Sequence, residues 1–150
     1  MAAHDYEPVV RSITVDAPVE KAFRVFTEDI STWWPFESHS IGEDKVVGAV
    51  IEARAGGRVY EVWADGTTCS WGEVTRFESP TAFALAWKVN PEAPAATEIT
   101  VTFTPQGEST EVTLEHKGWE RLGDGADDAR ESYSSGWSAV LDRYAGSFAA

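Results

Sequence analysis

The stretch TEITVTFTPQGESTEVTLEHK, residues 97–117, contains the clearest structural signal in the chain. Apolar residues alternate with polar ones in each of its halves, which is typical of half-buried strands. Gln106-Gly107 separates the halves and favours a turn. Two strands joined by so short a link must be antiparallel neighbours. In the second strand His116 falls on the same face as Val112 and Leu114, so the alternation predicts that its side chain points inward.

Four more strands are predicted upstream, which makes a long antiparallel meander. The six strands are expected at 47–54, 58–64, 68–78, 82–89, 97–104 and 109–117. Turn chemistry separates them at Gly56-Gly57, Asp65-Gly66, Ser79-Pro80, a Pro91 to Pro94 loop and Gln106-Gly107.

A long helix is predicted after the meander, from about Asp127 to Phe148. Its acidic start suits the positive end of a helix dipole. One stripe of apolar residues follows helical spacing, namely Tyr133, Trp137, Val140, Leu141, Tyr144 and Phe148. Gly136 lies in the middle of this helix, where glycine costs about 1 kcal/mol relative to alanine. It therefore marks either close packing or room left for a ligand.

The first part of the chain predicts one strand and two helical pieces. The strand covers residues 9–15, and Asp16 is the expected N-cap of the helix that follows. A second helical piece at 29–34 is stopped by Pro35, and residues 36–45 are expected to form a loop. The order of elements predicts a single α+β domain over residues 1–150, in which a curved antiparallel sheet of six to seven strands wraps the last helix.

Composition excludes several classes of partner. The net charge is −13, with 12 basic against 25 acidic residues, and binding of nucleic acid or an anionic membrane needs the opposite balance. Cys69 is the single cysteine, so no internal disulfide is expected. We find no signal peptide and no apolar run of about 20 residues that would cross a bilayer, so a cytoplasmic protein is expected.

Several short strings occur together in the order typical of one family. They are Val15-Asp16-Ala17-Pro18, Thr32-Trp33-Trp34-Pro35, Gly56-Gly57-Arg58-Val59-Tyr60-Glu61, Asp65-Gly66 with Trp71-Gly72-Glu73-Val74, and Val112-Thr113-Leu114-Glu115-His116 with Gly118-Trp119. Through them the chain resembles the activator-of-heat-shock-protein-90-ATPase homologue (AHSA-type) family of the START-like (SRPBCC) superfamily, which includes polyketide cyclases and the birch pollen allergen. The resemblance implies a helix-grip fold with a cavity between sheet and helix, but no particular reaction.

Three polar residues are weak candidates for acid–base chemistry. His116 is predicted to point inward, where it either serves as a base or ligand anchor or is a hydrogen-bonded core histidine. Glu61 shares a face with Trp63, and Glu73 shares one with Trp71. Burial would raise the pKa of either carboxyl group and suit it to proton transfer. The opposite register would place Glu61 in water, and both faces of its strand are partly apolar, so the sequence leaves this open.

Aromatic residues are the candidates for ligand binding. Trp33, Trp34 and Phe36 are expected at the mouth of the cavity, either as a gate or as a packed plug. The other candidates for the wall, each with core packing as the alternative, are Trp63, Trp71, Trp87, His116, Trp119, Tyr133 and Trp137. No metal site or cofactor is expected, since His4, His39 and His116 have no paired spacing and no cysteine cluster exists.

Three functions remain open on this evidence. The favoured hypothesis is a binding protein for a small hydrophobic or aromatic molecule. The second is an acid–base enzyme of the polyketide cyclase/dehydratase type that uses His116, Glu61 and Glu73. The third is a chaperone-associated interaction module, which is less favoured because the family's co-chaperone carries a separate N-terminal domain that this chain has no room for. Homodimerisation is compatible with all three.

Overall fold

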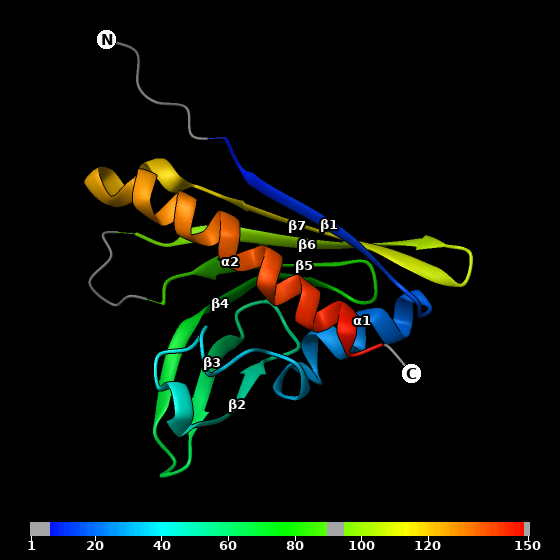
Figure 1. Ribbon diagram of the computed structural model, residues 1–150, viewed down its shortest axis with the longest axis horizontal. Helices are drawn as coiled ribbons and strands as arrows, with labels where there is room; N and C mark the ends of the chain where they lie inside the picture. Colours follow the sequence, from blue (N-terminus) through cyan, green and yellow to red (C-terminus); the bar gives the residue numbers. More distant parts are fainter. Residues whose placement is uncertain (1–6, 90–94, 149–150) are drawn as a thin grey trace.

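A seven-stranded antiparallel sheet curves around the C-terminal helix (Figure 1). The computed structural model describes residues 7–89 and 95–148. In chain order the elements are β1 (Val9–Val15), α1 (Val19–Thr27), η1 (Ile30–Thr32), η2 (Glu43–Lys45), β2 (Val46–Ile51), β3 (Arg58–Trp63), β4 (Thr68–Glu78), β5 (Ala82–Trp87), β6 (Thr97–Gln106), β7 (Ser109–Lys117), η3 (Trp119–Gly125) and α2 (Ala126–Gly146). The predicted α+β helix-grip class is confirmed.

The strand order is β1-β7-β6-β5-β4-β3-β2, so the predicted meander is present. β1 pairs with β7 and forms one edge of the sheet. Within the described residues every neighbouring pair is antiparallel. β1 is also joined to α2 by Arg11, which donates hydrogen bonds to the Ser134 carbonyl oxygen at 3.0 Å and to Ser138 Oγ at 3.2 Å. The first strand therefore fixes the position of the last helix.

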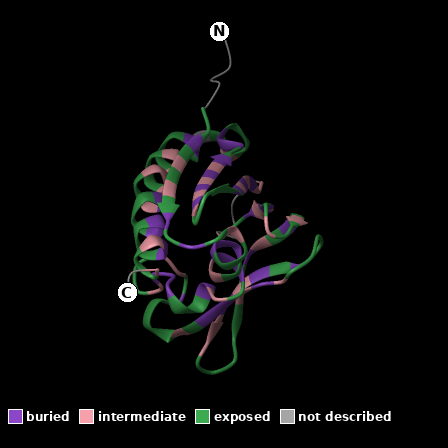
Figure 2. Cartoon of the chain, turned by 90° about the vertical axis from the view of Figure 1, so that its right-hand side faces the viewer, coloured by how far each residue is buried: buried purple, intermediate pink, exposed green. Residues whose placement is uncertain are grey.

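The helix α2 packs closely on the sheet side only over its C-terminal half. There Val140, Leu141 and Tyr144 are buried, and exposed residues cover the outer side of the helix (Figure 2). The Tyr144 ring lies 4.8 Å from the ring of Phe26 on α1, and its hydroxyl donates a 2.7 Å hydrogen bond to the Ala22 carbonyl. This end of the helix is closed by its own side chains.

Two features of the N-terminal region differ from the prediction. Asp16 is not the N-cap of α1, because Pro18 occupies the cap position and its carbonyl accepts the first helical hydrogen bond, from the Ala22 N–H at 2.9 Å. The helical piece expected at 29–34 is only the short 3-10 turn η1. The Pro91 to Pro94 break lies outside the described residues.

β4 contains an irregularity that changes which side chains face inward. Its pairing with β3 passes from Ser70 to Gly72 and leaves Trp71 as an extra, unpaired residue. Such a bulge reverses the alternation of the residues that follow it. Trp71 and Val74 are therefore both buried and Glu73 is exposed. The prediction that Glu73 shares a face with Trp71 was wrong for this reason.

No helix in the described part of the chain combines the length and the apolar character that crossing a membrane requires.

Candidate functional site

A cavity of about 300 Å³ lies beneath the middle of α2, between Ser132 and Val140. Its walls come from α2, the ends of β4 and β5, and the segment that follows η1. This volume is at the lower end of the range for small-molecule sites. The cavity therefore lies where the helix does not fill the curve of the sheet.

Four mutually packed indoles form one wall of the cavity, and we call them the tryptophan ring: Trp34, Trp71, Trp87 and Trp137. They contact each other around a closed circuit, and across it the rings of Trp34 and Trp87 lie 6.5 Å apart, so the indoles fill the space between them and the cavity lies against their outer surface. Their ring centroids are 5.0 Å apart for Trp34 and Trp71, 5.7 Å for Trp71 and Trp87, 5.9 Å for Trp87 and Trp137, and 6.0 Å for Trp137 and Trp34. These separations fall within the range at which aromatic rings attract one another.

The N–H group of every indole in the tryptophan ring donates to a protein acceptor. The acceptors are the His39 carbonyl oxygen for Trp34 at 2.8 Å, Glu61 Oε1 for Trp71 at 2.7 Å, the Tyr133 hydroxyl for Trp87 at 3.1 Å, and His116 Nδ1 for Trp137 at 2.9 Å. Because these donors are used within the protein, the indoles present mainly apolar surface to the cavity. The same bonds fix the orientation of each ring.

Of the residues predicted for the ligand site, the structure places Trp34, Trp71, Trp87, Tyr133 and Trp137 around the cavity. The others lie elsewhere. Trp33 is buried beside α1 and donates to the Val25 carbonyl at 2.8 Å, and the half-buried Phe36 packs against Trp71. Three further candidates do not line the cavity but contact residues that do: Trp63, His116 and Trp119.

Glu61 is completely buried on the inner face of β3, which settles the open register of that strand. Its carboxylate accepts four hydrogen bonds, from the backbone N–H groups of Ile41 and Gly42 at 2.8 Å and from the indoles of Trp63 and Trp71 at 2.7 Å. Burial raises the pKa of this carboxyl, but the four N–H donors outweigh it and hold the pKa below its ordinary value. Glu61 is thus a charged structural anchor.

The anchor at Glu61 positions two walls of the cavity together. Its bonds to the backbone of Ile41 and Gly42 hold the segment that carries His39 and Ser40. Its bond to the indole N–H of Trp71 orients that ring. Among the described residues no arginine takes part in it, and the nearby Arg58 lies over the Tyr60 ring at 4.6 Å.

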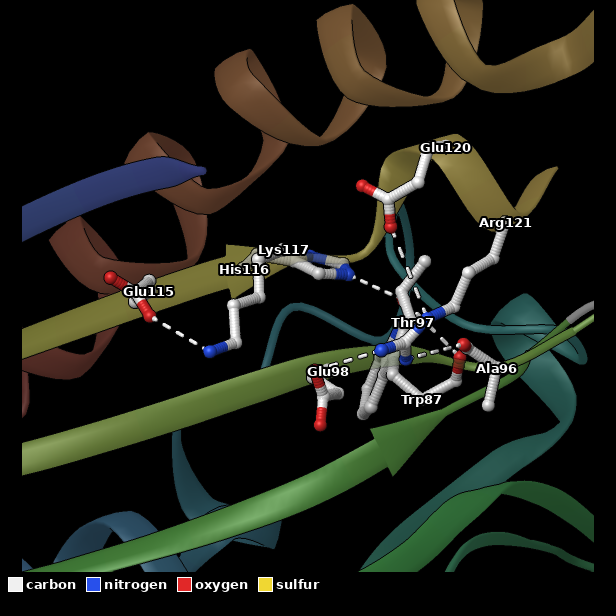
Figure 3. Close-up of polar contacts among 9 residues, drawn as sticks. All are labelled: Trp87, Ala96, Thr97, Glu98, Glu115, His116, Lys117, Glu120 and Arg121. Atoms are coloured by element: carbon white, nitrogen blue, oxygen red, sulfur yellow. Dashed lines mark hydrogen bonds and ion pairs between the residues drawn. The ribbon is translucent and has the colours of Figure 1, made fainter. Parts of the chain in front are cut away.

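His116 is fully buried at the far side of the tryptophan ring, and Figure 3 shows it pointing toward Thr97. Burial lowers the pKa of His116 to about 3, so the imidazole is neutral near pH 7. Because the Trp137 indole donates to Nδ1, the proton resides on Nε2, which donates to Thr97 Oγ1 at 2.6 Å. The Thr97 hydroxyl in turn donates to the Trp87 carbonyl at 3.3 Å. His116 thereby positions two members of the tryptophan ring.

Trp119 completes this support from behind. Its ring packs at a tilt of 41° against His116 with centroids 4.1 Å apart, and its N–H donates to the His116 carbonyl at 3.0 Å. The three acid–base candidates therefore do not converge on the cavity: Glu73 is exposed, and both Glu61 and His116 are fully occupied by protein partners.

Sequence reasoning missed the polar part of the cavity wall, which consists of Ser38, His39, Ser40 and Ser132. Three of these lie in a segment without hydrophobic periodicity, so no pattern indicated that the segment folds back over the sheet. His39 was considered only as a metal ligand. Within residues 7–89 and 95–148, no cluster of three or more His, Cys, Asp or Glu side chains is arranged to bind a metal ion.

A curved sheet that grips a long helix around an apolar hollow defines a helix-grip domain. Residues 16–148 match the family described as "Activator of Hsp90 ATPase homolog 1-like protein". The chain belongs to this family.

Solved structures agree with this assignment. An anthrahydroquino-gamma-pyrone synthase, Txn09, is 32% identical, with 94% of this chain and 96% of that chain covered and a TM-score of 0.60. The self-sacrificing resistance protein CalC from Micromonospora echinospora is 27% identical, with 95% and 94% covered and a TM-score of 0.71. Protein MLL2253 from Mesorhizobium loti, at 19% identity, 93% and 94% coverage and a TM-score of 0.69, shares the fold. No curated protein sequence compared with the chain matches it significantly.

Proposed function

We propose that this protein binds a small, uncharged aromatic molecule in the cavity beneath α2. The tryptophan ring carries the proposal, because four indoles form an aromatic wall of a hollow of about 300 Å³ and leave no free N–H donor. A flat aromatic molecule gains both apolar burial and ring–ring contacts in such a site.

The charge of the wall restricts the ligand further. None of the described residues around the cavity is Lys, Arg, Asp or Glu. A charged ligand would lose its hydration there without gaining an ion-pair partner, which is costly in an apolar environment. An uncharged molecule avoids this cost.

The related structures support an aromatic ligand. The name of Txn09, at 32% identity, describes a synthase for a fused aromatic compound, and CalC is named a resistance protein. Glu61 and His116 have no free capacity for proton transfer, so we propose binding rather than catalysis by these residues. Cytoplasmic localisation and a homodimer stay predictions; a fold relative from Colwellia psychrerythraea is described as the Aha1 dimer.

Blocking the cavity with Ser132→Trp should weaken binding of the probe 2-naphthol by about tenfold or more, measured by isothermal titration calorimetry. Ser132 is exposed on α2 but lines the cavity, so a large ring there fills the hollow with little effect on the core. Ser135→Trp is the matched control, because Ser135 lies on the same helix, is exposed and does not line the cavity. Equal affinities for the two variants would contradict the proposed site.

A further inference from the structure

Gly136 occupies the middle of α2 on the wall of the cavity, where its conformation does not require glycine. A Cβ atom built there would lie 3.6 Å from His39 Nε2, which is an ordinary van der Waals contact. Alanine would therefore fit and would stabilise the helix by about 0.5–1 kcal/mol. Close packing therefore does not explain why position 136 is a glycine, and another reason is needed for the space that it leaves beside His39.

The His39 ring presents its Nε2 atom to this space. Its Nδ1 atom lies 2.7 Å from Ser38 Oγ, and that hydroxyl has the Pro35 carbonyl as an acceptor at 3.5 Å. Either atom of this pair can be the donor; the tautomer that carries the proton on Nδ1, which then donates to Ser38, leaves Nε2 as an acceptor. No residue of the described chain donates a hydrogen bond to Nε2.

Tyr133 adds a second polar group to the wall, one helical turn before Gly136. Its hydroxyl oxygen accepts the Trp87 N–H at 3.1 Å, while its own hydrogen has no acceptor among the described residues. With the proton of His39 on Nδ1, the cavity offers one acceptor, His39 Nε2, and one donor, the Tyr133 hydroxyl. A ligand that buries its own hydroxyl group here can satisfy both its hydrogen and its oxygen, which matters because a buried polar group without a partner is costly.

We propose that the ligand is an aromatic molecule with a hydroxyl group that donates a hydrogen bond to His39 Nε2, and that Gly136 keeps this nitrogen accessible. The inference rests on the proposed function and names the class of ligand, a phenol or hydroxylated fused aromatic, for the same cavity. Glycine at position 136 then lowers the stability of α2 relative to alanine but leaves His39 Nε2 open to the ligand.

Two probes that differ in one hydrogen-bond donor test the inference. 2-Naphthol carries the hydroxyl, whereas 2-methoxynaphthalene has the same rings and oxygen but no donor. Calorimetry on the wild-type protein should show 2-naphthol binding about tenfold more tightly, the value of one good hydrogen bond of about 1.4 kcal/mol. Gly136→Ala should abolish this preference while raising the urea midpoint of unfolding.

The controls separate the hydrogen bond from other effects. Gly146→Ala makes the same change at the exposed end of α2, with nothing within 4 Å, and should keep the preference. His39→Phe retains a ring without the acceptor, and should lose the preference if folding is unaffected.

The outcomes distinguish the two proposals. If the wild-type protein binds both probes equally, or if Gly136→Ala weakens both equally, the hydroxyl inference is wrong and the aromatic site stands. If neither probe binds the wild-type protein, the proposed function is wrong and the inference is lost with it.

Discussion

Glu61→Gln is expected to lower the free energy of unfolding by about 2–6 kcal/mol, because two buried N–H groups lose their acceptor. Each carboxylate oxygen of Glu61 accepts one backbone N–H and one indole N–H. A glutamine replaces one of these oxygens with an NH₂ group, which places donors against donors. Two buried N–H groups then lose their acceptor, and each such loss costs about 1–3 kcal/mol.

Urea denaturation followed by circular dichroism measures this loss. Glu73→Gln is the matched control, because the same change of side chain occurs at an exposed position on the neighbouring strand and should stay within about 0.5 kcal/mol. Because Glu61 also fixes Trp71 and the segment around Ile41, Glu61→Gln should weaken binding of 2-naphthol as well. A variant as stable as the wild-type protein would show that the four hydrogen bonds are not made in solution.

The same substitution changes how stability depends on pH. The pKa of Glu61 is lower in the folded protein than its ordinary value of 4.5. A depressed pKa stabilises the fold above the unfolded value, and this stabilisation is lost as the pH falls from there through the folded value. Below pH 4.5 the wild-type protein should therefore lose stability more steeply than Glu61→Gln.

Gly72→Ala is expected to destabilise the protein by about 3 kcal/mol, at the upper end of the range for overpacking. A Cβ atom at Gly72 would lie only 1.9 Å from the Ala86 carbonyl oxygen on β5. The contact is with backbone, so relief requires the two strands to separate. Gly72 also pairs with Trp87, and the separation would displace a member of the tryptophan ring.

Thermal unfolding and 2-naphthol binding together test this prediction. Ser70→Ala is the control, since Ser70 lies on the same strand and is exposed. A Gly72→Ala variant with wild-type stability and affinity would contradict the close approach of β4 and β5. Loss of stability with unchanged affinity would show that the position of Trp87 does not matter for binding.

The fold was predictable from the sequence because most strands alternate regularly and short turns separate them. The inward direction of His116 followed from that alternation, and its burial agrees. Glu73 was placed on the wrong face because the bulge at Trp71 inserts one residue into the pairing; Gly72 beside it is the one local signal, since a glycine inside a strand often marks a bulge. A bulge depends on the neighbouring strand, which a local pattern does not contain.

The candidate site was predictable only in part, for a related physical reason. Aromatic residues on β4, β5 and α2 could be assigned to the interior from periodicity. Whether a given ring lines the cavity or fills the core depends on its tertiary contacts, as the neighbours Trp33 and Trp34 show, since only Trp34 lines the cavity. His39 lies in a segment held in place by a buried carboxylate on a distant strand, a long-range contact that sequence spacing does not reveal.

The central claim is that an aromatic molecule binds in the cavity against the tryptophan ring. The chain has seven tryptophans, and each indole N–H gives its own signal in a ¹H–¹⁵N NMR spectrum. Titration with 2-naphthol should shift the signals of Trp34, Trp71, Trp87 and Trp137 most, with one common affinity, and leave those of Trp33, Trp63 and Trp119 nearly unchanged. No shift at saturating probe, or shifts concentrated in the last three, would contradict the account.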